Sequence, residues 1–492
     1  MAPFDECTAV HSRAELPAKW ARPAPELAAE DPSRSFTPFS HRASLPSKET
    51  PKYLPEFFTE VIPNPWSEKN PNGVVNLGVA ENRACQETLQ NRFMQVKVDV
   101  PGPWMGYNDV SGMPELRQAF ADVLEKHVFQ NGVKVDPNLL VVSNGCTSTI
   151  SMLARIFSDG VLLPTKQPAK TTTKGCFAGL ASFFADKAGL TIAEKAVQPK
   201  MMYAGPRYPG FRMDFKGLAG VDPVQAYSGD PRRLPNEAEL DAALAREPSV
   251  CAFVVCNPEN PTGISYSQDE LMCLVRWCRK NRIYLISDEI YGASCWHEER
   301  QDGSWRPLFS LMEFADVTVW GLSKDFGSSG ARTSVAYIPH KPLLNAVKSF
   351  NILHALPNVA QVVLADVLGD AKFMDAYMPQ CRDAMRANAS IIKASLGEMK
   401  VPFVESDGAM FIWIDFKEFK IPAMELFRVL LKEYQVFLTP GTEFFEGGLE
   451  PDGSQVYWMR ACFGACGGQK GLQEGMKKLA KFVNDKRSAS NS

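Results

Sequence analysis

Three short apolar stretches of the sequence each end in polar side chains that are suited to chemistry. Short continuous apolar runs are typical of strands that are buried on both faces of a parallel sheet. The stretches are Val250–Cys256, which runs into Asn257–Gly263; Ile283–Ile286, which runs into Ser287–Tyr291; and Val317–Leu322, which stops before Ser323 and Lys324. The pattern therefore predicts three buried strands with polar residues at their carboxyl ends.

A helix is predicted between the first two of these strands, because Gln268–Arg282 has amphipathic periodicity. A strand, a helix and a strand in this order predict two parallel strands whose carboxyl ends lie side by side. Ligands bind at that edge of open parallel sheets. We therefore expect four functional side chains to converge there: Asn260, Asp288, Tyr291 and Lys324. A surface lysine in a loop is the alternative for Lys324 taken alone.

A further apolar strand, Leu139–Val142, leads into a glycine-containing turn, Ser143–Ser148, and then into an apolar helix, Thr149–Phe157. A turn that feeds a helix N-terminus offers free N–H groups and a favourable dipole to a phosphate group. Taken alone, this motif is weak evidence for a phosphate site. It supports such a site only in combination with Lys324.

The second half of the chain has a different pattern, in which helices alternate with strands of a smaller sheet. The predicted helices are Lys341–Phe350, Gln361–Leu368, Tyr377–Leu396 and Gln469–Lys486, and the predicted strands lie in Ala409–Asp415, Val436–Gly441 and Tyr457–Phe463. Arg460 lies in one of these apolar strands, where an unpaired guanidinium is costly, so we expect a carboxylate partner. That partner is either a substrate carboxylate, which suits planar bidentate recognition and is favoured, or an internal Asp or Glu.

Composition narrows the classes of function. The chain has 492 residues and a net charge of −3, without a basic run, so no nucleic-acid partner is expected. Its 12 cysteines are scattered without paired ligand spacing, which predicts reduced thiols, no metal site and a cytoplasmic location. No stretch approaches the ~18 apolar residues of a membrane helix, so no membrane partner is expected.

One ligand needs every group predicted at the sheet edge. A lysine forms a Schiff base with an aldehyde, a carboxylate pairs with a protonated ring nitrogen, an amide and a phenol bind a ring oxygen, and an arginine with nearby hydroxyls holds a phosphate. Pyridoxal 5'-phosphate has all of these groups. It is the predicted cofactor.

The same motifs carry a family resemblance. They are Asn-Pro-Glu-Asn-Pro-Thr-Gly at 257–263, Ser-Asp-Glu-Ile-Tyr at 287–291, Ser-Lys-Asp-Phe-Gly at 323–327 with Arg332, Asn-Pro-Asn-Gly at 70–73, Ala-Glu-Asn at 80–82, and Tyr-Pro-Gly-Phe at 208–211. The chain resembles the fold-type I pyridoxal-phosphate enzymes of aminotransferase class I/II, and within them most the 1-aminocyclopropane-1-carboxylate synthase branch. An ordered series of this kind is far more specific than a lone motif.

The resemblance implies an α/β architecture. We expect a large domain with a doubly wound, mostly parallel seven-stranded sheet and a smaller α+β domain. The expected divisions are a flexible segment at 1–52, a segment at 53–100 that packs with the small domain, the large cofactor-binding domain at 101–345, and the small domain at 346–486. Residues 166–205 exceed the family pattern, and we expect a surface insertion there that is not needed for catalysis.

The resemblance also implies the roles of individual residues. Lys324 forms the Schiff base, Asp288 pairs with the ring nitrogen, Asn260 and Tyr291 bind the ring oxygen, and Tyr208 stacks on the ring. Cys146, Thr147, Ser323 and Arg332 hold the phosphate, and Tyr107 reaches the phosphate of a neighbouring subunit, which implies a homodimer with shared active sites. Arg460 binds the substrate carboxylate, and Ala80 and Glu81 lie across the substrate pocket. For Glu81 itself a plain strand-to-helix connection is the favoured interpretation.

Two departures from the family pattern bear on the reaction. Gly321 stands where the family usually has a serine, so the phosphate loses a hydroxyl that Ser328 or Ser329 could replace. Val110 stands where the cyclopropane synthases carry a tyrosine, which weakens the case for their reaction on S-adenosylmethionine. We therefore favour an aminotransferase that acts on an amino acid and a 2-oxo acid. The alternatives are a carbon–sulfur lyase or cyclopropane synthase, and a catalytically disabled relative.

Overall fold

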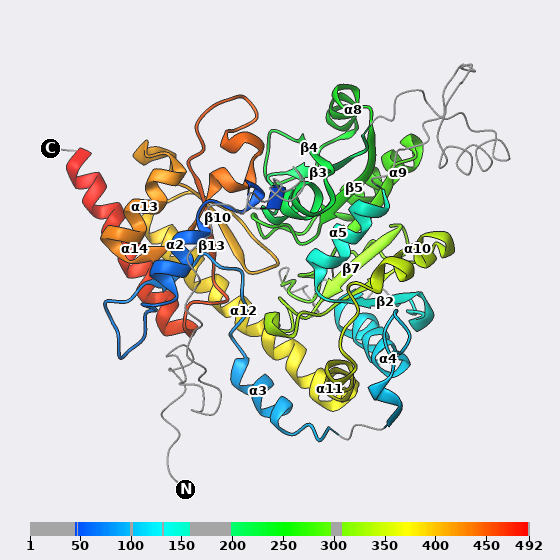
Figure 1. Cartoon of the computed structure of the whole chain (residues 1–492). Coiled ribbons are helices and arrows are strands. Elements are labelled where there is room, and N and C mark those ends of the chain that lie inside the picture. Colours follow the sequence, from blue (N-terminus) through cyan, green and yellow to red (C-terminus); the bar gives the residue numbers. More distant parts are fainter. Residues whose placement is uncertain are drawn as a thin grey trace, which may run out of the picture.

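A seven-stranded sheet forms the larger part of the protein (Figure 1). The computed structural model describes residues 45–46, 48–98, 102–129, 132–157, 198–296 and 308–490. The strands of this sheet, in spatial order, are β2 (Leu140–Ser143), β8 (Ser334–Tyr337), β7 (Val317–Gly321), β6 (Tyr284–Asp288), β5 (Val250–Cys256), β3 (Lys200–Gly205) and β4 (Asp222–Tyr227). Only β8 runs antiparallel to its neighbours, so the predicted mostly parallel sheet is confirmed.

Helices cover both faces of this sheet, as the doubly wound prediction requires. One face carries α5 (Cys146–Ile156), α7 (Gly210–Arg212) with the π-helical turn Met213–Gly217, and α10 (Lys341–Asn351). The other face carries α4 (Pro114–Val123), α8 (Glu237–Arg246) and α9 (Gln268–Asn281). In β5, Val254 packs toward α5, whereas Phe253 and Val255 pack toward α9. Burial on both faces explains why this strand is continuously apolar.

The unit β5–α9–β6 has the predicted parallel register, in which Cys256 pairs with Asp288. Helix α9 begins with a capping box formed by Ser267 and Glu270, and it ends at Arg282, whose backbone is left-handed. Reciprocal capping satisfies N–H groups at the helix start and fixes where the chain turns back. The two strand ends therefore meet at one edge of the sheet.

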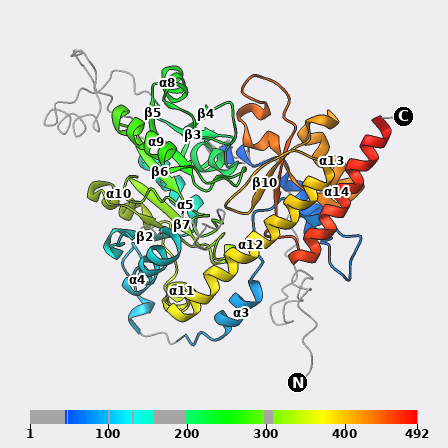
Figure 2. The same cartoon turned by 180° about the vertical axis from the view of Figure 1, so that it is seen from behind.

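A smaller antiparallel sheet lies beside the large one. Its strands, in spatial order, are β12 (Thr439–Pro440), β13 (Trp458–Cys462), β10 (Phe411–Asp415) and β9 (Phe403–Val404). Helices α13 (Ala423–Tyr434) and α14 (Gly468–Ser490) flank it, and β1 (Val75–Asn76) pairs in parallel with β11 (Val436–Phe437). The long helix α12 (Ala371–Met399) runs from the large part toward the small sheet (Figure 2). The remaining α-helices are α2 (Leu54–Glu56), α3 (Gln86–Met94) and α11 (Asn358–Gly369).

Two predicted boundaries are wrong. Residues 200–205, assigned to a surface insertion, form β3, which pairs with β4 and β5 in the large sheet. The rest of that predicted insertion, up to residue 197, lies outside the described residues. The flexible segment predicted for 1–52 ends too late, because Glu49 is buried and accepts a hydrogen bond from Arg212 (3.0 Å). Residues 1–44 lie outside the described part, and the other domain limits stay predictions.

A buried ion pair joins the edge of the large sheet to a loop of the small part. The Arg207 guanidinium is 1% exposed and donates to Glu446 (2.6 Å) and to the carbonyl of Glu443 (3.1 Å). It also lies over the ring of Tyr203, 5.1 Å from its centroid, and the Tyr203 hydroxyl donates to the same carboxylate. Breaking such a buried pair leaves an uncompensated charge, so this cluster ties the two parts together.

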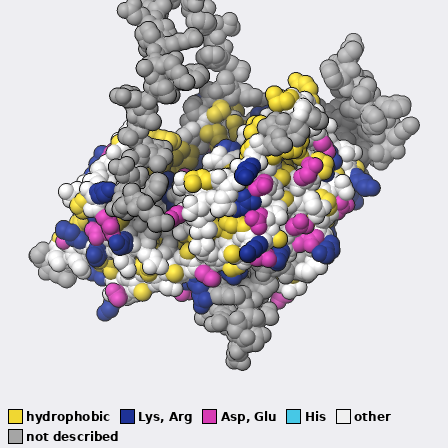
Figure 3. Space-filling model, turned by 90° about the horizontal axis from the view of Figure 1, so that it is seen from below, with side chains coloured by type: hydrophobic (Ala, Val, Ile, Leu, Met, Phe, Trp, Pro, Cys, Tyr) yellow, Lys and Arg dark blue, Asp and Glu magenta, His cyan; other side chains and the backbone are white. Residues whose placement is uncertain are grey.

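The surface of the described part shows mixed charge. Lysine and arginine side chains are interspersed with aspartate and glutamate on the face seen in Figure 3. Among the described residues, no helix is both long and apolar enough to cross a bilayer.

Candidate active site

A cavity of about 170 Å³ opens at the carboxyl edge of the large sheet. It lies between the N-terminus of α5, the ends of β5, β6 and β7, and two residues that flank α7, Tyr208 and Asp214. Nine of the residues predicted from the sequence line it: Cys146, Thr147, Tyr208, Asn260, Asp288, Tyr291, Ser323, Lys324 and Arg332. Residues up to 186 positions apart therefore meet in one place because parallel strands end together.

Lys324 follows β7 and points its amine across the cavity edge to the N-terminal segment. Its Nζ donates a hydrogen bond to the carbonyl of Ala80 (2.5 Å). Loss of hydration on burial lowers the pKa of Lys324, and the nearby Arg460 guanidinium lowers it further. A lysine with a lowered pKa has more of the neutral amine that acts as a nucleophile or base.

Asp288 ends β6 and is 5% exposed. Burial raises the pKa of Asp288 to about 7, opposed by a hydrogen bond from the Ile290 N–H (3.3 Å) and by the charge of Lys324. A carboxylate in this setting is poorly compensated, so a cation that enters the cavity gains a strong partner.

Asn260 and Tyr291 belong to a chain of hydrogen bonds that reaches the small sheet. The Asn260 amide nitrogen lies 3.5 Å from the Tyr291 hydroxyl, and the Asn260 oxygen accepts from Arg460 Nη1 (2.8 Å). The ring of Tyr291 packs edge-on against Phe411, with centroids 5.3 Å apart. The arginine thereby fixes which end of the Asn260 amide faces the tyrosine.

Arg460 lies in β13, and all its hydrogen-bond acceptors are neutral. Besides Asn260, it donates to the carbonyl of Gly78 (2.5 Å) and to the Thr439 hydroxyl (3.0 Å). Its Nε has no partner, and no carboxylate of the described residues pairs with the guanidinium. The internal Asp or Glu considered for Arg460 is thus not found in the described part. A buried, uncompensated guanidinium is suited to an anionic ligand.

The turn before α5 and Arg332 form a cradle for an anion. Gly145 has a φ of +87°, and a Cβ there would lie 2.6 Å from Arg332 Nη2. The positive φ favours glycine at this position, and any larger residue would also displace the Arg332 guanidinium. The first turn of α5 supplies free N–H groups, and Ser323 and Ser329 add hydroxyls.

Taken together, these groups fit pyridoxal phosphate. Arg332 and the start of α5 suit its phosphate, Asp288 its ring nitrogen, Asn260 and Tyr291 its ring oxygen, and Lys324 its aldehyde. Tyr208 lines the cavity, and a Cβ at Gly210 would collide with its ring at 2.3 Å, so the glycine permits the position of the ring. The fold and the cavity are those of a fold-type I pyridoxal-phosphate enzyme.

The sequence comparisons agree with this class. Residues 198–479, more than half of the chain, match the family described as aminotransferase class I and II. The protein belongs to this family, and pyridoxal 5'-phosphate is its cofactor.

Known relatives have differing names. The chain is 28% identical over 423 residues to "Probable aminotransferase ACS12" of Arabidopsis thaliana, covering 80% of this chain and 75% of the relative. It is 27% identical to a mouse protein named "Probable inactive 1-aminocyclopropane-1-carboxylate synthase-like protein 2", covering 72% of this chain and 57% of that one. It is 25% identical to 1-aminocyclopropane-1-carboxylate synthase 6 of Arabidopsis thaliana, covering 84% and 79%.

Solved structures share the fold. An aspartate aminotransferase from Thermus thermophilus with maleate superposes with a TM-score of 0.64 at 20% identity, covering 91% of this chain and all of that chain. An aminotransferase from Mycobacterium tuberculosis gives a TM-score of 0.66 at 19% identity, covering 92% and 100%.

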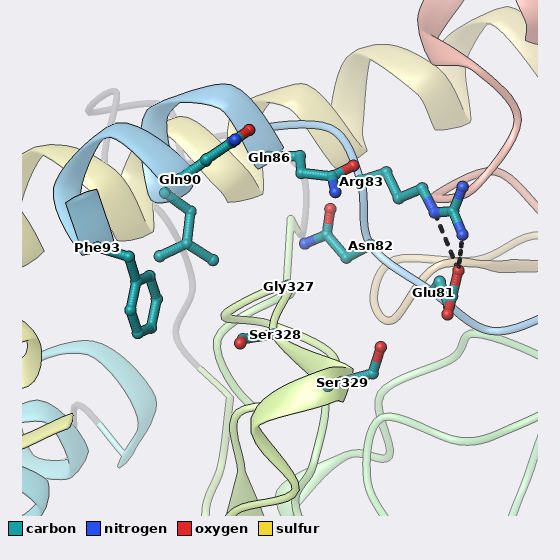
Figure 4. Close-up of a pocket in the computed structure, with 11 residues that line it drawn as sticks. Glu81, Asn82, Arg83, Gln86, Gln90, Phe93, Gly327, Ser328 and Ser329 are labelled. Atoms are coloured by element: carbon teal, nitrogen blue, oxygen red, sulfur yellow. Dashed lines mark hydrogen bonds and ion pairs between the residues drawn. The ribbon is translucent and has the colours of Figure 1, made fainter. Parts of the chain in front are cut away.

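Four predicted residues lie outside the cavity lining, and one of them, Arg460, reaches the cavity only through its hydrogen bond to Asn260. Ala80 contacts Lys324 only through its carbonyl. Glu81 pairs with Arg83 (2.6 Å) and lines a second cavity of about 300 Å³ between α3 and the loop after Lys324 (Figure 4). Ser329 lines both cavities, so they are neighbours. Tyr107 is fully exposed.

Asp214 also lines the first cavity, and the sequence motifs did not predict it. It lies between Phe211 and Phe215 on the buried side of a helical turn. An acidic residue on an apolar helix face was the available signal, because such a side chain is rarely buried without a purpose.

The close approach of both the Thr333 backbone and Cys146 accounts for Gly321. A Cβ at position 321 would lie 2.8 Å from the Thr333 carbonyl oxygen and 3.0 Å from Cys146 Sγ. The thiol thus occupies space that the family serine would need. Ser329 lines the cavity, as expected for a replacement hydroxyl, whereas Ser328 lines the second cavity.

Gly321→Ser should destabilise the protein by about 1–3 kcal/mol, because the new side chain overpacks against Thr333 and Cys146. Cys146→Ala in the same chain should recover part of this loss by removing one of the two close contacts. The free energy of unfolding from denaturant titration of both single variants and the double variant measures the coupling. Strictly additive losses would show that the thiol and the glycine are independent.

Asp288→Asn should raise the stability of the cofactor-free protein at alkaline pH while weakening cofactor binding. With its pKa raised above the ordinary value, native Asp288 holds a proton that the unfolded chain releases, so stability falls as pH rises from about 4 to about 7 and stays low above. Removing this group should restore on the order of 4 kcal/mol above pH 7 and almost nothing near pH 4. Denaturant unfolding at several pH values measures this, and parallel curves for both proteins would contradict it.

Proposed function

We infer that the protein is an aminotransferase that moves an amino group between an α-amino acid and a 2-oxo acid, with Lys324 as the Schiff-base lysine. The observation that carries this is that a buried arginine, Arg460, lies close to a partly buried lysine, Lys324. Arg460 has no carboxylate partner among the described residues, and Lys324 has a lowered pKa beside it. A fixed anion site next to a reactive amine suits a substrate that carries both a carboxylate and an amine.

Each side chain has a task in this proposal. Bound pyridoxal phosphate supplies the aldehyde that captures the amine and the ring that takes up electrons. Asp288 holds a proton on the ring nitrogen, and the Arg460 guanidinium orients the substrate carboxylate. Lys324 Nζ removes the proton from the substrate Cα as a general base. Asn260 and Tyr291 donate to the ring oxygen.

A homodimer with shared sites is part of the proposal. Tyr107 is fully exposed, and four other large apolar side chains of these segments are largely exposed, namely Met105, Ile352, Leu353 and Val359. Asn358 ties these segments together by donating to the carbonyls of Trp104 and Gly106 (2.9 Å each). His354 accepts from the Asn144 N–H (2.8 Å), beside the anion cradle. The exposed apolar surface of these segments suits contact with a second copy of the chain, whose Tyr107 would reach this site. The cytoplasmic location also remains part of the proposal.

A lyase or cyclopropane synthase is the second candidate, because relatives carry that name. Val110 takes the place of the synthase tyrosine, and its carbonyl accepts from Asn351. A disabled relative is the third candidate, since one similar protein is named inactive. The purified chain distinguishes the three. Conversion of amino acids only when a 2-oxo acid is added identifies a transaminase, conversion without an acceptor identifies a lyase, and a protein that binds the cofactor but converts nothing is a disabled relative.

Lys324→Arg should abolish the visible absorbance band of the cofactor-loaded protein and all turnover, because a guanidinium keeps the charge but cannot bond the aldehyde. Borohydride should fix the cofactor to the wild-type peptide that contains Lys324, as read by peptide mass spectrometry. Lys477→Ala, at a lysine whose side chain is 76% exposed, serves as the matched control and should label normally. Labelling of another lysine would refute the assignment.

Arg460→Gln should raise the KM for the amino acid roughly 30- to 100-fold and change kcat much less, because a charge-assisted pair of hydrogen bonds to the carboxylate is lost. Thr439→Val removes one neutral neighbour of the guanidinium and should have a smaller effect. Steady-state kinetics over a range of amino-acid concentrations checks both. An unchanged KM in Arg460→Gln would remove this residue from the substrate site.

A further inference from the structure

Asp325 directly follows Lys324 and is buried, and it has no role in the site described so far. It is 1% exposed. The carboxylate accepts hydrogen bonds from the Ala293 N–H (2.7 Å) and the Trp320 indole N–H (3.0 Å) at Oδ2, and from the Ser294 hydroxyl (2.5 Å) at Oδ1. Burying a carboxylate is costly unless donors satisfy it, so an acid at this position calls for an explanation beyond filling space.

The three donors come from two different strand ends. Trp320 lies in β7, shortly before Lys324, whereas Ala293 and Ser294 lie in the turn that follows β6. The Ser294 N–H donates to the Tyr291 carbonyl (2.9 Å), so this turn also holds Tyr291. The carboxylate therefore joins the segment that carries the reactive amine to the segment that carries the phenol of the site.

A third segment of the chain fixes the backbone of Asp325. Its carbonyl accepts a hydrogen bond from the Asn82 side-chain amide (3.2 Å). Two residues before Asn82, the Ala80 carbonyl accepts the bond from Lys324 Nζ (2.5 Å). The same N-terminal segment thus contacts both the lysine amine and the residue after it, so the amine has one defined reach.

The carboxylate binds its donors as an anion at neutral pH. Burial raises the pKa of Asp325 to about 6, and the hydrogen bonds from Ser294, Trp320 and Ala293 oppose that rise. All three donors are neutral groups, and hydrogen bonds to an ionised acceptor are stronger than those between neutral groups. The contact is therefore a set of directed hydrogen bonds rather than an ion pair, which suits the fixing of a position.

We propose that Asp325 is a positioning residue for Lys324, and that by accepting these three hydrogen bonds it fixes where the amine meets the cofactor aldehyde and the substrate Cα. This role rests on the function proposed above for Lys324. Asp325 does not line the cofactor cavity, so it touches neither cofactor nor substrate and acts through its neighbour. An error of about 1 Å in the place of a reacting group can cost about 100-fold in rate, so a small shift of this segment should be measurable.

The test follows the visible absorbance band that appears when pyridoxal phosphate is added to the full chain stripped of cofactor. The rate of its appearance reports how readily Lys324 reaches the aldehyde. Asp325→Leu keeps the size but accepts no hydrogen bond, so its band should form at a rate lower by roughly tenfold or more. Asp325→Asn should stay within about fivefold of the wild type. Its oxygen can keep both N–H donors, and its amide can donate to the Ser294 hydroxyl, which can turn to accept.

Turnover supplies a second readout. In Asp325→Leu, kcat per bound cofactor should fall in parallel with the band rate, whereas the KM for the amino acid should change little, because Arg460 binds the carboxylate. A merely structural role would reduce the amount of folded protein and leave the rate of each occupied site unchanged. Asp316→Leu is the matched control, since Asp316 accepts the Leu285 N–H (2.8 Å) between the same two strands at their opposite ends. Its band rate should equal that of the wild type.

Two results would overturn the proposal. Equal band rates in Asp325→Leu and the wild type would leave the residue a structural role only. A loss in Asp325→Asn as large as in Asp325→Leu would show that its charge, not its hydrogen bonds, matters. If circular dichroism shows that Asp325→Leu does not fold, Ser294→Ala decides, because it removes one donor and should slow the band about threefold. An unchanged rate in Ser294→Ala would then refute the proposal.

Failure of the proposed function is distinguishable from failure of this role. A wild type that forms the band without turnover would refute the aminotransferase function alone, since the band rates of the variants still test Asp325. A wild type that binds the cofactor but forms no band would refute Lys324 as the Schiff-base lysine, and the role of Asp325 with it.

Discussion

Removal of water from charged groups at one edge of the seven-stranded sheet is the constraint on which the site depends. Lys324 and Asp288 lie where parallel strands end, and burial shifts the pKa of each toward its neutral form. The protein maintains this unfavourable arrangement because the strands beneath are buried on both faces and cannot relax. A bound molecule with a ring cation and an aldehyde would offset this electrostatic cost of burial.

Much of the architecture could be predicted because burial leaves a direct trace in the sequence. Strand β5 is apolar without interruption, β7 is interrupted only by Thr318, and the amphipathic α9 between β5 and β6 predicted their parallel register. Strand β3 was not predicted, since Lys200–Gly205 begins with a charge and ends in small residues, although it pairs on both sides, with β5 and with β4. Its burial comes from neighbours that the local pattern does not reveal.

The site residues that follow strand ends could be predicted from the sequence. The contacts between elements that are distant in the sequence could not. Asn260, Asp288 and Lys324 could be brought together from topology alone. The pairing of Arg460 with Asn260, 200 positions apart, and the complementarity of Cys146 with Gly321 depend on packing between distant elements. Asp214 carried a signal only as an acid among aromatic residues, and a local pattern does not say which cavity such a side chain enters.

The position of Arg460 has a consequence for how a ligand is sensed. The guanidinium belongs to the small sheet, yet one of its bonds crosses the seam to Asn260 in the large part, whose amide in turn lies next to Tyr291. Under the proposed role of Arg460, an incoming substrate carboxylate would compete for the same donors, weaken this contact between the two sheets and free the Asn260 oxygen. A molecule without a carboxylate would leave the contact in place. One side chain would then couple ligand selection to the fit between the two parts of the protein.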